Sequence, residues 1–270
     1  MKTRIISGIV ITVIAALLLV GQIFVPIIMP FAAAVFAILT VYEMLFATGM
    51  NKNIIMVVAG MLPAAILPFI FTGFVSFPIN AVFTVFILLQ FALCLKYHSS
   101  LEIGGVIGSV AMPVLISYAF SAMAVLAGKY ILFYMILILC WSAVADTGAY
   151  FTGVAFGKHK MTPNISPKKT WEGLAGGMVL SILATLLACL IYSAVTDYKV
   201  NIIACVAVTP VFVLVGVMGD LMASVIKRKC GIKDYGNLIP GHGGIMDRFD
   251  SILMMTPLFF ELVKIIPFIK

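Results

Sequence analysis

The sequence predicts an all-α, polytopic integral membrane protein with about nine transmembrane helices. Of its 270 residues, 63% are hydrophobic and only 10% are charged, and the mean hydropathy is +1.21. Soluble domains carry about 25% charged residues, so a chain this apolar is typical of a membrane protein. Apolar runs long enough to cross a bilayer recur along the whole chain, separated by Pro, Gly, Asn or charged residues.

The individual spans follow from these runs and their breaks. The N-terminus is basic and then apolar like a signal peptide, but no small-residue cleavage site follows it, so we predict a retained first span. Pro26 and Pro30 leave open whether the chain kinks or turns between the first two spans. We expect the nine helices near residues 5–26, 30–48, 54–73, 78–96, 103–126, 130–155, 172–195, 200–225 and 245–267.

Lysine and arginine are distributed unevenly between the two sides that nine spans define. The side with the N-terminus and the loops after spans two, four, six and eight carries 13 of the 17 Lys and Arg residues. The positive-inside rule therefore predicts that these loops are cytoplasmic, in a multi-pass protein of the inner (plasma) membrane. Because this topology explains the formal net charge of +7, the charge does not indicate nucleic-acid binding.

Residues that can carry chemistry are concentrated in the second half of the chain. Residues 1–128, with about five spans, are predicted to be a scaffold in which Glu43 and Glu102 are acidic exceptions. Residues 129–270, with about four spans, are predicted to be the catalytic region, with loops at 156–171 and 226–244. The five cysteines are scattered and lack CxxC spacing, so we expect neither a disulfide framework nor a zinc site.

Three aspartates stand where an acidic side chain is costly. Asp146 lies in span six, Asp220 in span eight, and Asp247 at the start of span nine. An acidic residue inside a spanning helix costs about 2.5–3.5 kcal/mol on insertion scales, so it usually faces a polar cavity. For Asp146, an acid at a helix end that reaches toward water is the alternative. Asp220 fits that alternative less well, because apolar residues stand on both sides of it.

Helical spacing groups Asp220 with other polar residues. Asp220, Ser224 and either Lys227 or Arg228 lie three or four residues apart, so they share one face of span eight. That face runs from inside the membrane to its cytoplasmic edge, where an anionic ligand can reach the cations.

Asp247 and Asp250 are three residues apart and share a face at the start of span nine. Carboxylates from two helices that meet at a membrane-surface pocket would suit Mg²⁺, a hard cation that prefers a few carboxylates plus phosphate oxygens. A salt bridge, such as one between Asp247 and Arg228, is the competing interpretation.

A Pro-Gly-His-Gly-Gly turn precedes the last span. Gly243 and Gly244 would let a phosphate approach the backbone N–H groups at the start of that helix, because glycine has no Cβ. His242 is expected to contact phosphate or to support the turn, because the sequence shows no His cluster with metal-ligand spacing.

The loop after span six also predicts an anion site. Ser166 followed by Pro167 indicates a helix start, with Ser as the cap and Pro at the first helical position. Lys168 and Lys169 would then lie in the first turn, where the helix dipole disfavours cations unless an anion binds there. Anchoring by the positive-inside rule is the alternative for these lysines.

Small residues recur every four positions through the end of span six and just beyond it, at Ala145, Ala149, Gly153 and Gly157. Such a stripe allows close helix packing, which we expect to hold span six so that Asp146 reaches the site.

The segment S-V-I-K-R-K-C-G-I-K-D-Y-G-N-L-I-P-G-H-G-G-I-M-D-R-F-D, residues 224–250, resembles the signature of the phosphatidate cytidylyltransferases, or CDP-diacylglycerol synthases. The stretches D-T-G-A-Y from Asp146 and S-P-K-K-T-W-E-G from Ser166 resemble other motifs of that family. The resemblance implies a membrane enzyme that joins CTP to phosphatidate, giving CDP-diacylglycerol and pyrophosphate with Mg²⁺. It also implies a homodimer and leaves a second cation open.

Together, the residues and the resemblance predict a set of site residues. The predicted catalytic residues are Asp220, Asp247, Lys227, Arg228 and Asp250, with Asp220 and Asp247 as the metal ligands. The predicted substrate-binding residues are Lys168, Lys169, Ser166, Thr170, Ser224, Lys233, His242, Gly243, Gly244, Arg248 and Asp146.

Two other functions compete with this prediction. A transporter would distribute its acids along a pathway and show internal symmetry, whereas these acids cluster on one side. A CTP-dependent kinase of lipid alcohols would need a base beside a neutral hydroxyl and should lack the full GHGG-x-x-D-R-x-D run. The absence of G-x-S-x-G, Walker A and HExxH motifs argues against common hydrolases, NTPases and zinc proteases.

Overall fold

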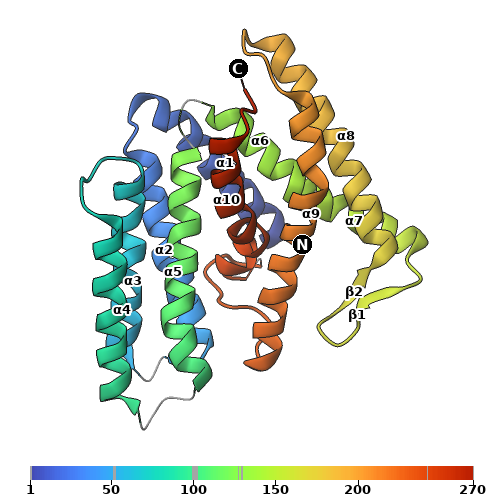
Figure 1. Ribbon diagram of the computed structural model, residues 1–270. Helices are drawn as coiled ribbons and strands as arrows, with labels where there is room; N and C mark the ends of the chain where they lie inside the picture. The colour runs from blue at the N-terminus through green and yellow to red at the C-terminus, as the bar shows by residue number, and fades with distance from the viewer. Residues whose placement is uncertain are drawn as a thin grey trace. The chain divides into compact units, whose positions relative to one another are not determined.

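The structure is a computed structural model that describes residues 2–50, 53–98, 103–126, 128, 130–241 and 243–269. Glu102 and His242, named above, lie outside these residues, and so do Lys52, Lys129 and Lys270, which belong to the Lys and Arg residues counted above. Nearly all regular structure in the described chain is helical (Figure 1), which confirms the all-α class. Seven helices of the described part are long and apolar enough to span a bilayer. The exact number of nine spans stays a prediction.

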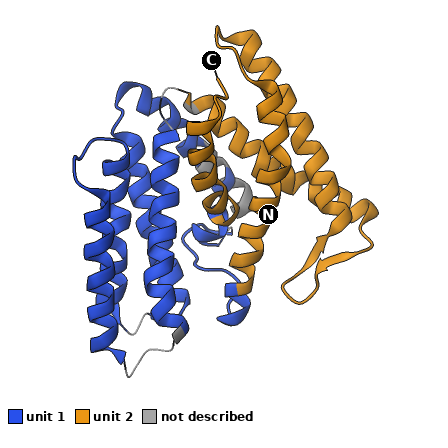
Figure 2. Ribbon diagram, in the orientation of Figure 1, with its two compact units in different colours: residues 1–128, 226–249 blue, residues 129–225, 250–270 orange. Residues whose placement is uncertain are grey.

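The chain forms two compact units (Figure 2). The first comprises residues 1–128 and 226–249, and the second comprises residues 129–225 and 250–270. One division between the units falls after Gly128, and the predicted domain bounds stay predictions. The predicted region 129–270 is nevertheless divided, because the segment 226–249 groups with the N-terminal helices. The scaffold and catalytic roles given to the two predicted regions stay predictions.

The first unit begins with five helices: α1 (Lys2–Phe24), α2 (Ile28–Ala47), α3 (Ile54–Phe71), α4 (Ile79–Lys96) and α5 (Ile103–Leu126). Pro26 lies in a short turn between α1 and α2, so the chain turns there. Pro30 lies in the first turn of α2, where proline costs little because its missing N–H would have no partner in the helix.

Aromatic packing attaches the end of the segment 226–249 to the helices of the first unit. Phe249 lies 5.1 Å from Phe120 of α5 and 5.7 Å from Phe36 of α2, measured between ring centroids. Phe120 is almost fully buried. These rings fix the first turn of α10 (Met246–Ile265) against α2 and α5, which positions the residues just before it.

The second unit begins with a span made of α6 (Ile131–Leu139), the π-helical turn η3 (Cys140–Val144) and α7 (Ala145–Phe156). A short hairpin follows, with β1 (Lys160–Thr162) antiparallel to β2 (Ser166–Thr170). Helices α8 (Trp171–Val195) and α9 (Ile202–Lys229) come next. Because α9 continues to Lys229, the first four residues of the predicted loop 226–244 are helical.

The core of the second unit is built around Trp141 of the π-helical turn. Its ring stacks on Phe212 at 4.1 Å with an interplanar angle of 7°, and Phe259 of α10 meets it edge-on at 4.9 Å. Its indole N–H donates to Thr209 Oγ1 at 3.0 Å, so the buried polar atom has a partner. This packing holds α9 and the later part of α10 against η3.

The small-residue stripe of α7 packs against glycines of α8, as predicted. A Cβ at Gly177 would lie 2.5 Å from Ala145 O and 3.2 Å from Ala149 Cβ, and one at Gly173 would lie 2.8 Å from Ala149 O. Only glycine permits this approach, because a methyl group would overlap the facing backbone. The close packing positions Asp146, one residue after Ala145.

The predicted helix start at Ser166 is wrong. Residues 166–170 form strand β2, with Thr162 opposite Ser166 and Lys160 opposite Thr170. The helix begins at Trp171, where Thr170 is the N-cap and its Oγ1 accepts a hydrogen bond from Gly173 N at 3.1 Å. Lys168 and Lys169 therefore precede the helix, and the argument from a helix dipole does not apply to them.

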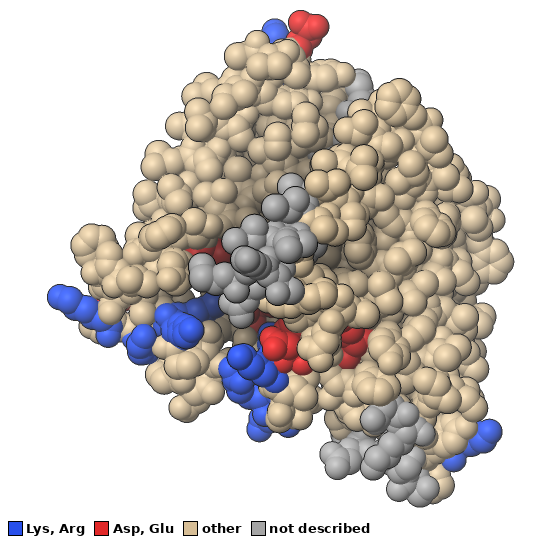
Figure 3. Space-filling model, turned by 180° about the vertical axis from the view of Figure 1, so that it is seen from behind, with Lys and Arg blue, Asp and Glu red and all other residues tan. Residues whose placement is uncertain are grey.

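The surface agrees with a membrane environment. In α4 and α8, few residues are buried although both helices are strongly apolar. On the face drawn in Figure 3, Lys and Arg gather in a few patches, and most of the remaining surface carries no charged side chain. An exposed apolar surface of this extent suits contact with lipid.

Candidate active site

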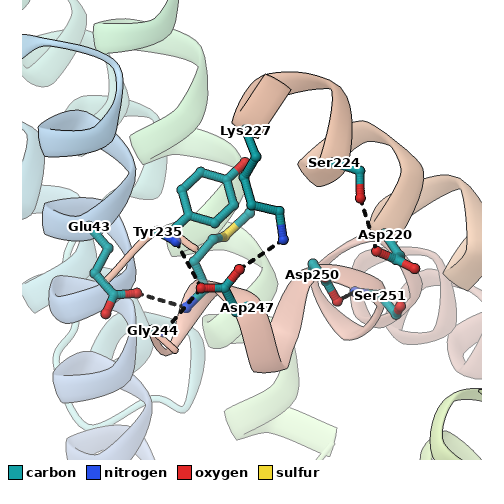
Figure 4. A network of polar contacts seen from close by, with 10 residues as sticks. Glu43, Asp220, Ser224, Lys227, Tyr235, Gly244, Asp247, Asp250 and Ser251 are labelled. Atoms are coloured by element: carbon teal, nitrogen blue, oxygen red, sulfur yellow. Dashed lines mark hydrogen bonds and ion pairs between the residues drawn. The ribbon is translucent and has the colours of Figure 1, made fainter. Parts of the chain in front are cut away.

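Asp247 is the centre of a polar network within the first unit (Figure 4). Its Oδ1 forms an ion pair with Lys227 Nζ at 2.8 Å, and its Oδ2 accepts hydrogen bonds from Tyr235 N at 2.8 Å and Gly244 N at 3.0 Å. The aspartate side chain is only 3% exposed. Lys227, rather than the Arg228 considered above, is thus the ion-pair partner of Asp247.

The structure explains why the turn contains glycine at positions 243 and 244, which the sequence did not reveal. The Gly244 N–H is already used by Asp247, so it is not available to a phosphate in this conformation. A Cβ at Gly244 would overlap the carboxylate of Glu43. Gly243 has a φ of +84°, which disfavours other residues.

A cavity of about 490 Å³ opens within the loop that contains these glycines. Its polar and charged lining residues are Lys233, Asp234, Asn237 and Arg248, and Gly243 and Pro240 add backbone surface. Its volume is in the range of small-molecule sites. The structure therefore brings the predicted Lys233, Gly243 and Arg248 to one cavity, whereas the predicted His242 lies outside the described residues.

Asp220 is the centre of a second network, within the second unit. Its Oδ2 pairs with Lys169 Nζ at 2.5 Å, and its Oδ1 lies 3.5 Å from Ser224 Oγ, one turn further along α9. This contact between Asp220 and Ser224 confirms that the two residues share a helix face. Lys169 reaches Asp220 from strand β2, not from the first turn of a helix as predicted.

Asp146 belongs electrostatically to the same cluster. It follows the π-helical turn η3; neighbouring protein atoms desolvate its carboxylate, and the charges of Lys169 and Asp220 also act on it. The second unit thus gathers two carboxylates, one hydroxyl and one ammonium group, and π-helical turns are frequent at functional sites.

The other predicted residues have different surroundings. Thr170 caps α8, and Lys168 is exposed on β2 beside Ser166 at the start of that strand. Arg228 is exposed near the end of α9. Asp250 Oδ1 accepts a hydrogen bond from Ser251 N at 2.7 Å.

Comparison with known proteins gives the family. The sequence profile of the cytidylyltransferase family matches residues 2–266, nearly the whole chain and every predicted site residue. The chain belongs to the cytidylyltransferase family.

Three relatives within this family carry the same name. The chain is 40% identical over 132 residues to the phosphatidate cytidylyltransferase of Haemophilus influenzae. It is 45% identical over 130 residues to that of Staphylococcus epidermidis, and 42% identical over 135 residues to that of Bacillus subtilis. These matches cover 48–50% of this chain and 45–47% of the relatives, so the chain matches about half the length of these curated relatives.

Each of the two networks contains a carboxylate of the kind that binds a hard divalent cation. Carboxylate and hydroxyl oxygens are the ligands that Mg²⁺ prefers, and Asp220 and Asp247 each hold a lysine ammonium group close to a carboxylate oxygen. Each carboxylate therefore already stabilises a positive charge. Among the described residues, no group of three or more His, Cys, Asp or Glu side chains has metal-site geometry, so substrate oxygens would have to complete the coordination.

The sequence analysis assigned Glu43 to the scaffold and did not predict a role for it near the site. Its carboxylate is buried and its Oε2 accepts a hydrogen bond from Met246 N at 2.9 Å (Figure 4). The signal was present, because an acid inside an apolar span is as costly at residue 43 as at residue 220. Tyr235, Asp234 and Asn237 were also missed, since nothing in their spacing separates them from an ordinary loop.

Proposed function

We propose that this protein is a phosphatidate cytidylyltransferase, which transfers CMP from CTP to phosphatidate and releases pyrophosphate. The observation that carries the proposal is the family match over residues 2–266, which spans both polar networks. The names of the three relatives add the lipid substrate, because each is called a phosphatidate cytidylyltransferase. CTP and phosphatidate are accordingly the proposed substrates, and phospholipid biosynthesis is the proposed process.

The reaction requires positioning and charge stabilisation more than proton transfer. A phosphate oxygen of phosphatidate attacks the α-phosphorus of CTP, a new P–O bond forms, and the bond from that phosphorus to the β-phosphate breaks. The nucleophile is already an anion, so no strong general base is needed. Cys230 lies outside the spans, and burial raises the pKa of its thiol, which lowers its reactivity as a nucleophile near neutral pH.

The cations of the two units suit the polyanionic substrates. Lys233 and Arg248 line the loop cavity, where they can hold phosphate groups of the nucleotide. Lys227 and Lys169 each neutralise an aspartate. Both lysines are proposed to bind phosphate oxygens and to stabilise charge during transfer, and the paired carboxylates would hold the metal ion.

Asp220 and Asp247 are proposed to hold Mg²⁺. The supporting observation is the pairing of each carboxylate with a single ammonium group, as described above. When bound, Mg²⁺ would neutralise triphosphate charge and polarise the phosphoryl oxygens. Asp146 and Asp250 are weaker candidates for the same role.

The cellular setting is also a proposal. The bias of Lys and Arg toward one side supports an inner-membrane protein whose active-site loops face the cytoplasm. The homodimer implied by the family resemblance stays part of this proposal.

Labelled CTP tests the proposed reaction. Purified protein would be mixed with phosphatidate, Mg²⁺ and CTP labelled either at the α- or at the γ-phosphate. We expect the α-label to reach lipid with release of pyrophosphate, and the γ-label to stay in the aqueous phase. Transfer of the γ-label to a lipid alcohol, without α-label, would instead identify a CTP-dependent lipid kinase.

A further inference from the structure

A buried acid on α2 has no part in the reaction proposed above. Glu43 is only 2% exposed, and its Oε1 has no hydrogen-bond partner among the described residues. No ion pair with a lysine or arginine is found for it in the described chain. A carboxylate buried in an apolar span is costly, so its contacts in the structure indicate what it does there.

The loop before α10 is shaped around this carboxylate. A Cβ at Gly236 would lie 2.5 Å from Glu43 Oε1, and a Cβ at Gly244 would lie even closer to Oε2. Two glycines from the two ends of the loop thus leave space for one side chain of α2. The arrangement fixes the loop relative to α2, because neither backbone segment can move toward the carboxylate.

The same carboxylate holds the start of α10. Met246 N donates to Glu43 Oε2 at 2.9 Å, and Gly244 N donates to Asp247 Oδ2 at 3.0 Å. Glu43 therefore accepts the N–H of the first residue of α10, which has no intrahelical partner, and Asp247 accepts an N–H from the turn just before the helix. Because Asp247 directly follows Met246, the position of Glu43 determines where the Asp247 carboxylate lies.

We propose that Glu43 is a positioning residue that orients Asp247 by holding the turn from Gly244 to Met246. This proposal rests on the proposed function, because it assumes that Asp247 takes part in the transfer of CMP. Glu43 itself is not catalytic, since it is buried and does not line the loop cavity.

Three substitutions test this role. Glu43→Ala removes the acceptor of the Met246 N–H, whereas Glu43→Gln keeps an oxygen and nearly the same volume. Gln90→Ala is the matched control, because Gln90 is a buried polar residue of the same unit that donates to Met56 O at 3.1 Å, a contact that involves neither the loop nor α10. If Glu43→Ala does not accumulate as folded protein, Glu43→Asp is used in its place. Aspartate is one methylene shorter, so its carboxylate is drawn away from the Met246 N–H.

The kinetic readout separates positioning from general destabilisation. For Glu43→Ala we expect kcat to fall by about 100-fold, as for a catalytic group misplaced by about 1 Å, with the KM for CTP within about threefold. Glu43→Gln should retain most of the activity, and Gln90→Ala should lower the melting temperature without a selective loss of kcat. Normal kcat in folded Glu43→Ala, or an equal loss in Gln90→Ala, would overturn the proposal.

Amide hydrogen exchange provides a readout independent of activity. We expect faster exchange in peptides containing residues 243–247 in Glu43→Ala, and unchanged exchange there in Gln90→Ala. Unchanged exchange in Glu43→Ala would overturn the positioning role even if the enzyme is active. If exchange is faster in Glu43→Ala but the wild-type protein transfers no CMP, the positioning contact stands and only the proposed function is rejected.

Discussion

At the scale of single residues, Lys227 and Asp247 form a pair buried deeply enough to matter for stability. The side chains are 14% and 3% exposed, and breaking a buried pair by removing one partner costs about 3–5 kcal/mol because the other charge stays behind. We predict that Asp247→Asn and Lys227→Met each destabilise the protein and abolish turnover. Melting temperature and the labelled-CTP assay measure the two effects.

The double variant Lys227→Met/Asp247→Asn separates these effects. Its stability loss should be smaller than the sum of the two single losses, because no uncompensated charge remains. Its activity should stay as low as that of either single variant. Recovery of turnover in the double variant would mean that the pair serves only stability.

Lys169 and Asp220 form a more exposed pair, at 21% and 30% exposure. Because it is only partly exposed and Lys169 Nζ itself is buried, this pair should contribute less to stability than the pair of Lys227 and Asp247. We therefore predict that Asp220→Asn lowers the melting temperature less than Asp247→Asn does, while it lowers kcat strongly and increases the Mg²⁺ concentration needed for activity. Near-normal activity at limiting Mg²⁺ would remove Asp220 from the proposed metal ligands.

The sequence identified the two aspartates as site residues, but it did not predict which lysine pairs with each of them. Asp220 and Asp247 stood out because acids are costly in apolar spans, a one-residue property. The ion pairs with Lys169 and Lys227 depend on how strand β2 and the end of α9 lie in each unit, which spacing does not reveal. Glu43 carried the same signal but was assigned to a scaffold, because its partner Met246 stands 203 residues away.

At the scale of elements, the interface between α7 and α8 depends on Gly177. A Cβ there would lie 2.5 Å from Ala145 O, so Gly177→Ala must push the helices apart. We predict a clear loss of melting temperature together with reduced activity, because Asp146 moves with α7.

Gly108→Ala is the matched control for this interface. Gly108 is also inside a helix, but a Cβ there would meet nothing within 4 Å. Replacing it should be neutral or stabilise the protein by about 0.5–1 kcal/mol, since alanine favours helix more than glycine does. Equal destabilisation by both variants would contradict the close packing of α7 and α8.

Helix positions were largely predictable, whereas the start of α8 was not. The apolar runs locate the spans to within a few residues because length and composition suffice for that. Ser166-Pro167 looks like a helix start, but pairing with β1 keeps the chain extended as far as the true cap at Thr170. Such pairing is a tertiary property, and local capping preferences cannot anticipate it.

At the scale of the whole molecule, composition alone predicts a polytopic membrane protein. The side of the membrane on which each loop lies can be tested directly. We predict that a cysteine at Lys160, in the hairpin, reacts with an impermeant thiol reagent only when the cytoplasmic face is accessible. A cysteine at Lys199 should react only from the other face. Both lysines are exposed.

The native cysteines should add little background to this labelling. Four are buried, and burial raises the pKa of the Cys230 thiol, which slows its reaction near neutral pH. Labelling of both introduced cysteines from the same face would contradict the predicted topology.

The contact between Glu43 and Met246 also has a consequence for biosynthesis. A ribosome adds about 5–20 residues per second, so about 10–40 s separate the synthesis of these two residues. During that interval Glu43 is inside an apolar segment without its partner, and the nascent helix α2 is less stable in the bilayer than it will become. We expect chains truncated before Gly243 to be removed by membrane proteases faster than the same truncated chains with Glu43→Leu. Only the chains that keep Glu43 contain a buried carboxylate without the Met246 N–H that would bind it.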